Sequence, residues 1–188
     1  MALRLNGSTS GYVELNAPAV AGSTALTVPY GIVQIVSENY TSRFASTGTN
    51  PSGWETITNF NATITPKFSS SKILVMVNIG VTSNNYGDTS SAFRIRRGSS
   101  TVLVGNTSGS RDAASFRTMS GMNQDHGWSI GFLGEDSPGS TSALTYSIQV
   151  NSQDNSICTI NYEQRNNNNG DAYSMDCLSN MTLMEVAA

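Results

Sequence analysis

The strongest hydrophobic pattern in the chain lies between Lys72 and Val81, in the stretch KILVMVNIGV. Its residues Ile73 to Val77 form a continuous apolar run. The run is too short to span a membrane, and its β-branched residues disfavour a helix. We therefore predict a strand that is buried on both faces and around which the rest of the chain packs. Its two faces are expected to be covered by other strands or, at one face, by a neighbouring subunit.

The remaining strands are predicted from alternation of apolar and polar residues. Ala143 to Val150 alternates at every position, and Trp54 to Ile64 alternates more loosely, with Ile57, Phe60, Ala62 and Ile64 as inward candidates. Further strands are predicted at Ile32 to Val36, Phe93 to Arg97, Thr101 to Gly105, Trp128 to Leu133, Ile157 to Tyr162 and Asn180 to Val186, with Gly98-Ser99-Ser100 as a three-residue hairpin connection. Strands at this spacing, with almost no helical periodicity, indicate an all-β antiparallel sandwich or jelly roll.

The chain divides into an N-terminal arm, residues 1–30, and a sandwich domain, residues 31–188. Short strands are predicted in the arm at Leu3 to Leu5, Tyr12 to Asn16 and Ala25 to Val28. An arm of this size cannot bury its apolar residues alone, so it must pack on its own domain, on other copies around a threefold axis, or on a larger assembly. The expected contact residues are Leu3, Leu5, Tyr12, Val13, Leu15, Leu26 and Val28.

The composition narrows the class of protein. Charged residues make up 12% of the chain, against about 25% in typical domains, so small uncharged polar groups must hydrate most of the surface. This is common in all-β extracellular and virion proteins. The net charge of −3 gives no basic field for nucleic acid or anionic lipid. The first residues show no secretion signal, and we expect neither membrane insertion nor a nucleic-acid partner.

Few residues suggest catalysis or metal binding. His126 is the single histidine and is read as a loop residue, although a metal ligand or a Ser-His-Asp arrangement is the alternative. Glu135 and Asp136 are read as exposed turn acids that point apart, with a glycosidase carboxylate pair as the alternative. Cys158 and Cys177 match no zinc spacing and are either buried thiols or a disulfide. We expect no enzyme activity and no cofactor.

Two polar loops are the candidates for recognition. They carry tyrosines among Asn, Gln and Asp side chains, a mixture suited to adaptable contacts around a flat aromatic anchor. Such loops bind sugars or proteins, or they are loop tips without a partner. The candidate residues are Asn84, Asn85, Tyr86, Tyr162, Arg165, Asn167, Asn168 and Tyr173.

Three segments resemble a known family. They are the opening LNGSTSGYVELNAPAVAGSTALTVP, the middle ITPKFSSSKILVMVNI with the following FRIRRGSS, and the ending MTLMEVAA. They are similar to segments of bacteriophage virion proteins, especially those of cyanophages and other marine phages, which are usually labelled tail-fibre or virion structural proteins. The resemblance implies a homotrimeric, β-rich, non-enzymatic protein on the particle surface, made in the host cytoplasm.

The position on the particle is open between two alternatives. A tail fibre normally needs a shaft, and only about thirty residues precede the sandwich domain. We therefore favour a trimeric capsid decoration (cement) protein bound to the major capsid protein. The alternative is a receptor-binding tip that is docked on another tail or fibre protein and contacts the host surface, with a surface glycan as the candidate receptor.

Overall fold

The chain folds into strands throughout the part that the computed structural model describes, which is residues 3–6, 12–15, 31–47, 53–83, 90–118, 127–152, 156–162 and 176–187. No helix occurs among these residues, so the all-β prediction is confirmed. The strands are β1 Leu3–Asn6, β2 Tyr12–Leu15, β3 Ile32–Tyr40, β4 Phe44–Ala45, β5 Glu55–Ile64, β6 Lys72–Ser83, β7 Ser91–Arg97, β8 Ser100–Val102, β9 Phe116–Arg117, β10 Trp128–Asp136, β11 Leu144–Ser152, β12 Cys158–Ile160 and β13 Ser179–Val186.

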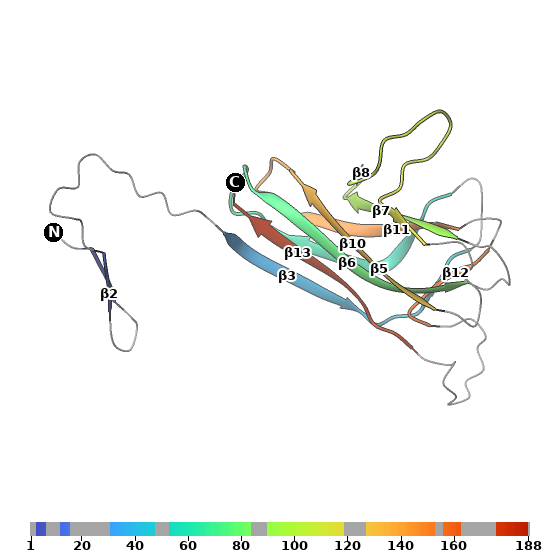
Figure 1. Ribbon diagram of the computed structural model, residues 1–188, viewed down its shortest axis with the longest axis horizontal. Helices are drawn as coiled ribbons and strands as arrows, with labels where there is room; N and C mark the ends of the chain where they lie inside the picture. Colours follow the sequence, from blue (N-terminus) through green and yellow to red (C-terminus); the bar gives the residue numbers. More distant parts are fainter. Residues whose placement is uncertain are drawn as a thin grey trace.

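Two antiparallel sheets pack face to face (Figure 1). In the first sheet, β6 lies between β13 and β10, and β3 forms the edge beyond β13. The short strand β12 pairs with the end of β6 on the same edge as β13, and β4 pairs with the other edge of β12. In the second sheet, β5, β11 and β7 lie side by side, with β8 and β9 along the outer edge of β7. We call these the β6 sheet and the β11 sheet.

The pairing is that of one long hairpin rolled up on itself. β7 pairs with β8 and β9, β6 pairs with β10, β5 pairs with β11, and β3 pairs with β13, so early and late strands meet in nested order. Partners in each pair share a sheet, and successive pairs alternate between the two sheets. This is the connectivity of a jelly roll, the more specific of the two predicted architectures.

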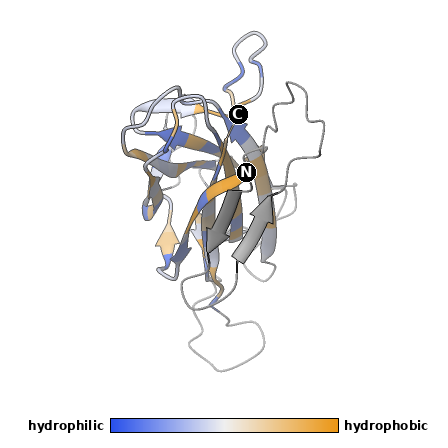
Figure 2. Ribbon diagram, turned by 90° about the vertical axis from the view of Figure 1, so that its left-hand side faces the viewer, coloured by the Kyte–Doolittle hydropathy of each residue, from blue (hydrophilic) through white to orange (hydrophobic). Residues whose placement is uncertain are grey.

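The core lies between the inward faces of the two sheets. On β6, alternate residues from Ile73 to Val81 are at most 3% exposed, and they face residues such as Ile95 and Ile148, both 0% exposed, on the β11 sheet. Stacked rings add to this packing, with Tyr40 and Phe60 centroids 4.7 Å apart. Hydrophobic and hydrophilic residues are accordingly interspersed along the strands in Figure 2.

The prediction that Lys72 to Val81 is buried on both faces is wrong for the single chain. Ile73, Val75 and Val77 face the core, but Leu74 is only half-buried and Met76 is 40% exposed. These two side chains lie on the outward face of the sheet, which no strand among the described residues covers. An apolar run therefore indicated a strand correctly but not what covers its second face.

Three local predictions are also corrected. The β7–β8 turn has the two residues Gly98 and Ser99, since Arg97 pairs with Ser100, and β8 ends at Val102. β10 continues to Asp136 because it stays paired with β6 along its whole length. The polar excursion after residue 105 contributes β9, whose Phe116 stacks on Phe93 at 5.0 Å.

Asn59 explains why Ile57 and Phe60 both point inward although three positions separate them. The register of β5 against β11 is irregular here, since Asn61 pairs with Ser147 whereas Thr56 pairs with Gln149. Asn59 has a φ of +64°, in the left-handed region. This bulge shifts the phase of alternation, so both predicted inward residues are buried.

Glu185 joins two of the segments that carry the family resemblance. Its inward-facing carboxylate is buried and accepts hydrogen bonds from the backbone N–H groups of Lys67 (2.7 Å) and Phe68 (3.2 Å) and from Gln34 Nε2 (2.5 Å). Burial alone would raise the pKa of Glu185, but these hydrogen bonds hold it below its ordinary value of 4.5. The C-terminal strand is thereby tied to the loop that precedes β6.

We expect Asn59→Ala to lower the free energy of unfolding by about 1 kcal/mol, because the left-handed backbone conformation is less favourable for alanine than for asparagine. Asn59→Gly should keep the wild-type stability. The matched control is Asn61→Ala on the same exposed surface, with an expected change within about 0.5 kcal/mol. Equal urea midpoints for Asn59→Ala and Asn61→Ala, at one protein concentration, would show that the bulge carries no strain.

We expect Glu185→Gln to reduce the unfolding free energy at neutral pH by about 1–3 kcal/mol, since a carboxylate that accepts several hydrogen bonds is replaced by a neutral amide. The folded-state pKa is depressed, so this stabilisation is present above pH 4.5 and is lost as pH falls through the folded pKa. Urea unfolding at several pH values should show the two proteins converging in acid. The exposed Glu38→Gln variant is the control, and a constant gap at all pH values would contradict the assignment.

Candidate functional site

The outward face of the β6 sheet carries an exposed apolar surface. Leu133 is 64% exposed, Ile35 56% and Met76 40%. Cross-strand pairing places these side chains in adjacent rows, one containing Met76 and Leu133 and the next containing Ile35, Met184 and Leu74. We define the outer apolar face as Ile32, Ile35, Leu74, Met76, Leu133 and Met184. A contiguous apolar surface of this kind marks an interaction site more often than a solvated face.

The outward face of the β11 sheet is polar in contrast. Thr63 and Thr145 are hydrogen-bonded through their hydroxyl groups at 2.8 Å, and Gln149 bridges Thr56 (3.0 Å) and Arg94 (2.7 Å). Arg94 lies on this face, while Phe93 is on the buried one, as the sequence predicted. The outward face of the β6 sheet also carries hydrogen-bonded polar pairs, Ser37 with Thr182 (2.9 Å) and Ser129 with Asn78 (2.9 Å). The two outward faces therefore differ in the exposed leucine, isoleucine and methionine side chains, which only the β6 sheet carries among the described strands of the sandwich.

The carboxylates of Glu135 and Asp136 do not form a pair. Glu135 lies on the outward face and binds Lys72 Nζ at 2.6 Å, at the rim of the outer apolar face. Asp136 points inward, is 9% exposed, and accepts hydrogen bonds from Arg97 Nη1 (2.5 Å) and the Tyr146 hydroxyl (2.7 Å). The prediction that they point apart is confirmed, but Asp136 is a buried link between the sheets rather than an exposed turn acid.

A shallow depression of about 330 Å³ lies beside the polar face. Asp112 and Arg117 bring opposite charges to it, and Asn151 adds an amide. Trp54 adjoins it, donating its indole N–H to Asp112 at 3.2 Å while Arg94 stacks 4.4 Å from the ring centroid. No motif in the sequence analysis pointed to this depression, because its residues come from segments far apart in the chain.

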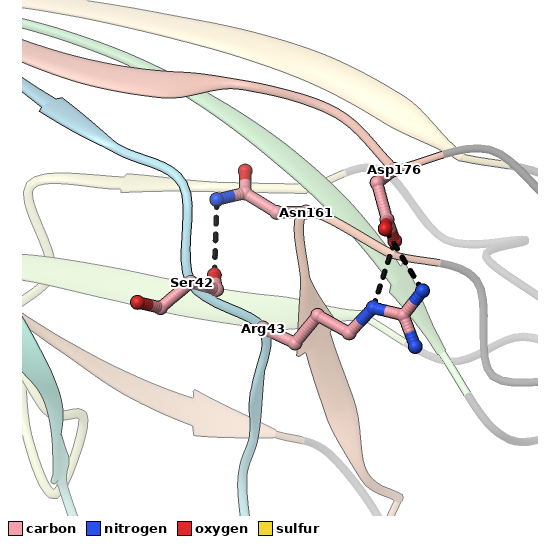
Figure 3. A network of polar contacts seen from close by, with 4 residues as sticks. All are labelled: Ser42, Arg43, Asn161 and Asp176. Atoms are coloured by element: carbon pink, nitrogen blue, oxygen red, sulfur yellow. Dashed lines mark hydrogen bonds and ion pairs between the residues drawn. The ribbon is translucent and has the colours of Figure 1, made fainter.

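Arg43 contacts the residues on both sides of the segment that contains four of the eight candidate recognition residues. Its guanidinium binds the carboxylate of Asp176 through two hydrogen bonds of 2.8 Å, as Figure 3 shows. The same group lies 5.3 Å from the ring centroid of Tyr162. Burial raises the pKa of Tyr162, and the positive charge of Arg43 opposes that shift. Tyr162 and Asp176 flank residues 163–175, so one arginine fixes the base of this segment.

Asn161 reinforces this base. It is 1% exposed with a φ of +67°, and its side-chain amide donates to the backbone oxygens of Tyr40 (2.6 Å) and Ser42 (3.1 Å). Figure 3 shows the hydrogen bond to Ser42. Its own backbone oxygen accepts from Cys177 N at 2.7 Å. The sequence analysis did not single out Asn161 or Arg43, since their role depends on contacts across the fold.

The predicted site residues fall in three groups. Leu3, Leu5, Tyr12, Val13 and Leu15 lie in the hairpin of β1 and β2, and Tyr162 lies at the base described above. The others lie outside the described residues: Leu26, Val28, Asn84, Asn85, Tyr86, Arg165, Asn167, Asn168 and Tyr173, together with His126. Thr82 lies two residues before Asn84, the first candidate residue of one loop. Its hydroxyl group donates a hydrogen bond to the backbone oxygen of Tyr162, the first candidate residue of the other loop, at 3.1 Å.

The two cysteines are free and differ in environment. Cys158 is fully buried, and burial raises the pKa of its thiol to about 12, whereas Cys177 is exposed. The disulfide alternative is therefore wrong, and of the two predicted buried thiols only Cys158 is buried.

The described residues contain no group of three or more His, Cys, Asp or Glu side chains arranged to hold a metal ion. They also contain no helix with the length and apolar character needed to cross a bilayer. No protein-family model and no curated protein matches this chain.

We expect Arg43→Ala to speed hydrogen exchange of the Cys177 amide roughly two- to five-fold, because an exposed but bidentate ion pair at the loop base is lost. Arg43→Lys should recover only part of the protection, since an ammonium cannot bind the carboxylate in the same two-pronged way. The exposed Arg111→Ala variant serves as control. Unchanged exchange in Arg43→Ala would mean that Asn161 alone holds the base.

Proposed function

We propose that this protein is a non-enzymatic bacteriophage virion surface protein, a homotrimeric capsid decoration protein. The observation that carries the proposal is the difference between the two outward faces of the sandwich. An exposed apolar face on a chain whose other outward face is polar is expected of a subunit that assembles with other copies or with a particle.

The family resemblance supports the same proposal. Two of its three segments meet in the fold, where β6 pairs with β13 and Glu185 binds the loop before β6. Two of the segments that carry the resemblance are therefore neighbours in the fold. The major capsid protein is the proposed partner on the particle, and the protein is made in the host cytoplasm before assembly.

The second candidate function is that of a receptor-binding tip of a tail or fibre. Two observations favour it: the polar depression beside Trp54, and the base at Arg43 that holds the segment with Arg165, Asn167, Asn168 and Tyr173. A depression with a carboxylate, a guanidinium and an amide suits a polyhydroxylated ligand such as a surface glycan.

The purified protein should bind capsids that lack it and should raise their resistance to heating or to low ionic strength. Cosedimentation measures the binding, and release of packaged DNA on heating measures the protection. Immunogold labelling of intact particles should place the protein over the capsid. Host cells should not retain it in the same sedimentation assay.

Binding to host cells, with labelling at the tail and no affinity for capsids, would reverse the ranking in favour of the receptor-binding tip. In that case Asp112→Ala should weaken cell binding and Arg111→Ala should not, because only Asp112 lines the depression. Cleavage of host polysaccharide by the purified protein would contradict the non-enzymatic proposal.

A further inference from the structure

The hairpin of β1 and β2 has one wholly apolar face. Its register pairs Leu3 with Leu15 and Leu5 with Val13, so these four positions fall on the same face. Arg4 pairs with Glu14, and Asn6 pairs with Tyr12, on the opposite face. A two-stranded hairpin is marginal in water unless its apolar face packs against something.

The hairpin has no partner strand in its own chain's sandwich. β1 and β2 form a separate two-stranded sheet, and neither pairs with a described strand of the sandwich. No described strand covers the outer apolar face of the sandwich, where Leu133, Ile32 and Ile35 are each more than half exposed. The register of the hairpin and the exposure on the sandwich thus give two apolar β faces within one chain.

The segment that joins the hairpin to the sandwich ends at the edge of the outer apolar face. β3 begins at Ile32, which belongs to the outer apolar face, and Gly31 accepts a hydrogen bond from Ala187 N at the same end of the sheet. Residues 16–30 separate the hairpin from this point. A linker of this length reaches roughly 50 Å when extended, enough for the hairpin to arrive at a neighbouring copy.

We propose that the hairpin of one copy docks with its apolar face on the outer apolar face of a second copy, so that each subunit both gives and receives an arm. This inference rests on the proposed homotrimer, in which each copy must meet its neighbours through a surface. The outer apolar face contains four of the large hydrophobic side chains that are at least 40% exposed, Ile32, Ile35, Met76 and Leu133. Arms exchanged in one direction around a threefold axis close a ring in which every such face is covered.

The exchange can be tested by cross-linking between differently marked copies. One variant carries Leu5→Cys and the other carries Leu133→Cys, both with Cys177→Ser to remove the exposed native thiol. The two proteins are unfolded, mixed and refolded together, and then treated with a short bismaleimide. We expect a covalent dimer on a denaturing gel, with a cross-linked peptide that joins residues 5 and 133.

The control mixture replaces Leu133→Cys with Thr58→Cys, an exposed position on β5 in the β11 sheet, and should give no such product. A chain carrying both Leu5→Cys and Leu133→Cys that cross-links only within itself, as a monomer, would overturn the exchange in favour of docking on the same chain. Absence of any cross-link between these positions would overturn docking altogether.

A second measurement covers the case in which the cysteine variants fold poorly. Leu133→Asp places a charge on an exposed position of the face, so the fold should be retained while light scattering shows loss of the trimer. A trimer of unchanged mass would overturn the proposal. These outcomes are independent of where the protein sits, because arm exchange can fail while the protein still binds capsids, and can occur in a protein that never binds them.

Discussion

The structure depends on the hydrogen bonding of β6 along both of its edges. β10 pairs with it from Ile73 to Val81 on one edge, and β13 followed by β12 pairs with it on the other. The nested pairs of the jelly roll are joined in this sheet only through the β6–β13 contact. Its inward side chains from Ile73 to Val81 are buried in the core, so β6 contributes to both the hydrogen bonding of its sheet and the packing between the sheets.

The two outward faces of the sandwich differ in their side chains. The β11 sheet faces outward with threonine, glutamine and arginine side chains that bind one another. The β6 sheet faces outward with leucine, isoleucine and methionine, next to polar pairs such as Ser129 and Asn78. Burying the apolar part of this face against another copy, as proposed, would release water from both surfaces. The polar face stays available for solvent or for a ligand.

Buried or clamped polar groups hold the two ends of the sandwich. Glu185 closes one end by accepting hydrogen bonds from the loop before β6, and Asp136 links the two sheets through Arg97 and Tyr146. Asn161 and Arg43 form the base of the segment 163–175. The two residues that flank segment 163–175, Tyr162 and Asp176, are therefore held by side chains that the segment itself does not contain.

The sequence by itself determined the fold class and the longer strands, but not the two-residue strands β4 and β9. The alternation at Tyr146, Ile148 and Val150 and the apolar run of β6 identify elements that bury one face, because side chains alternate across a strand whatever its partners are. Even Glu185 carried a signal, since it continues the inward phase of Met181 and Leu183 as a charged residue. Only the tertiary structure decided that Leu74 and Met76 face outward, that Asp136 is buried beside Glu135, and that Arg43 meets Tyr162 and Asp176. These outcomes depend on which strands cover which face and which distant segments meet, and the period of a single strand contains no information about either.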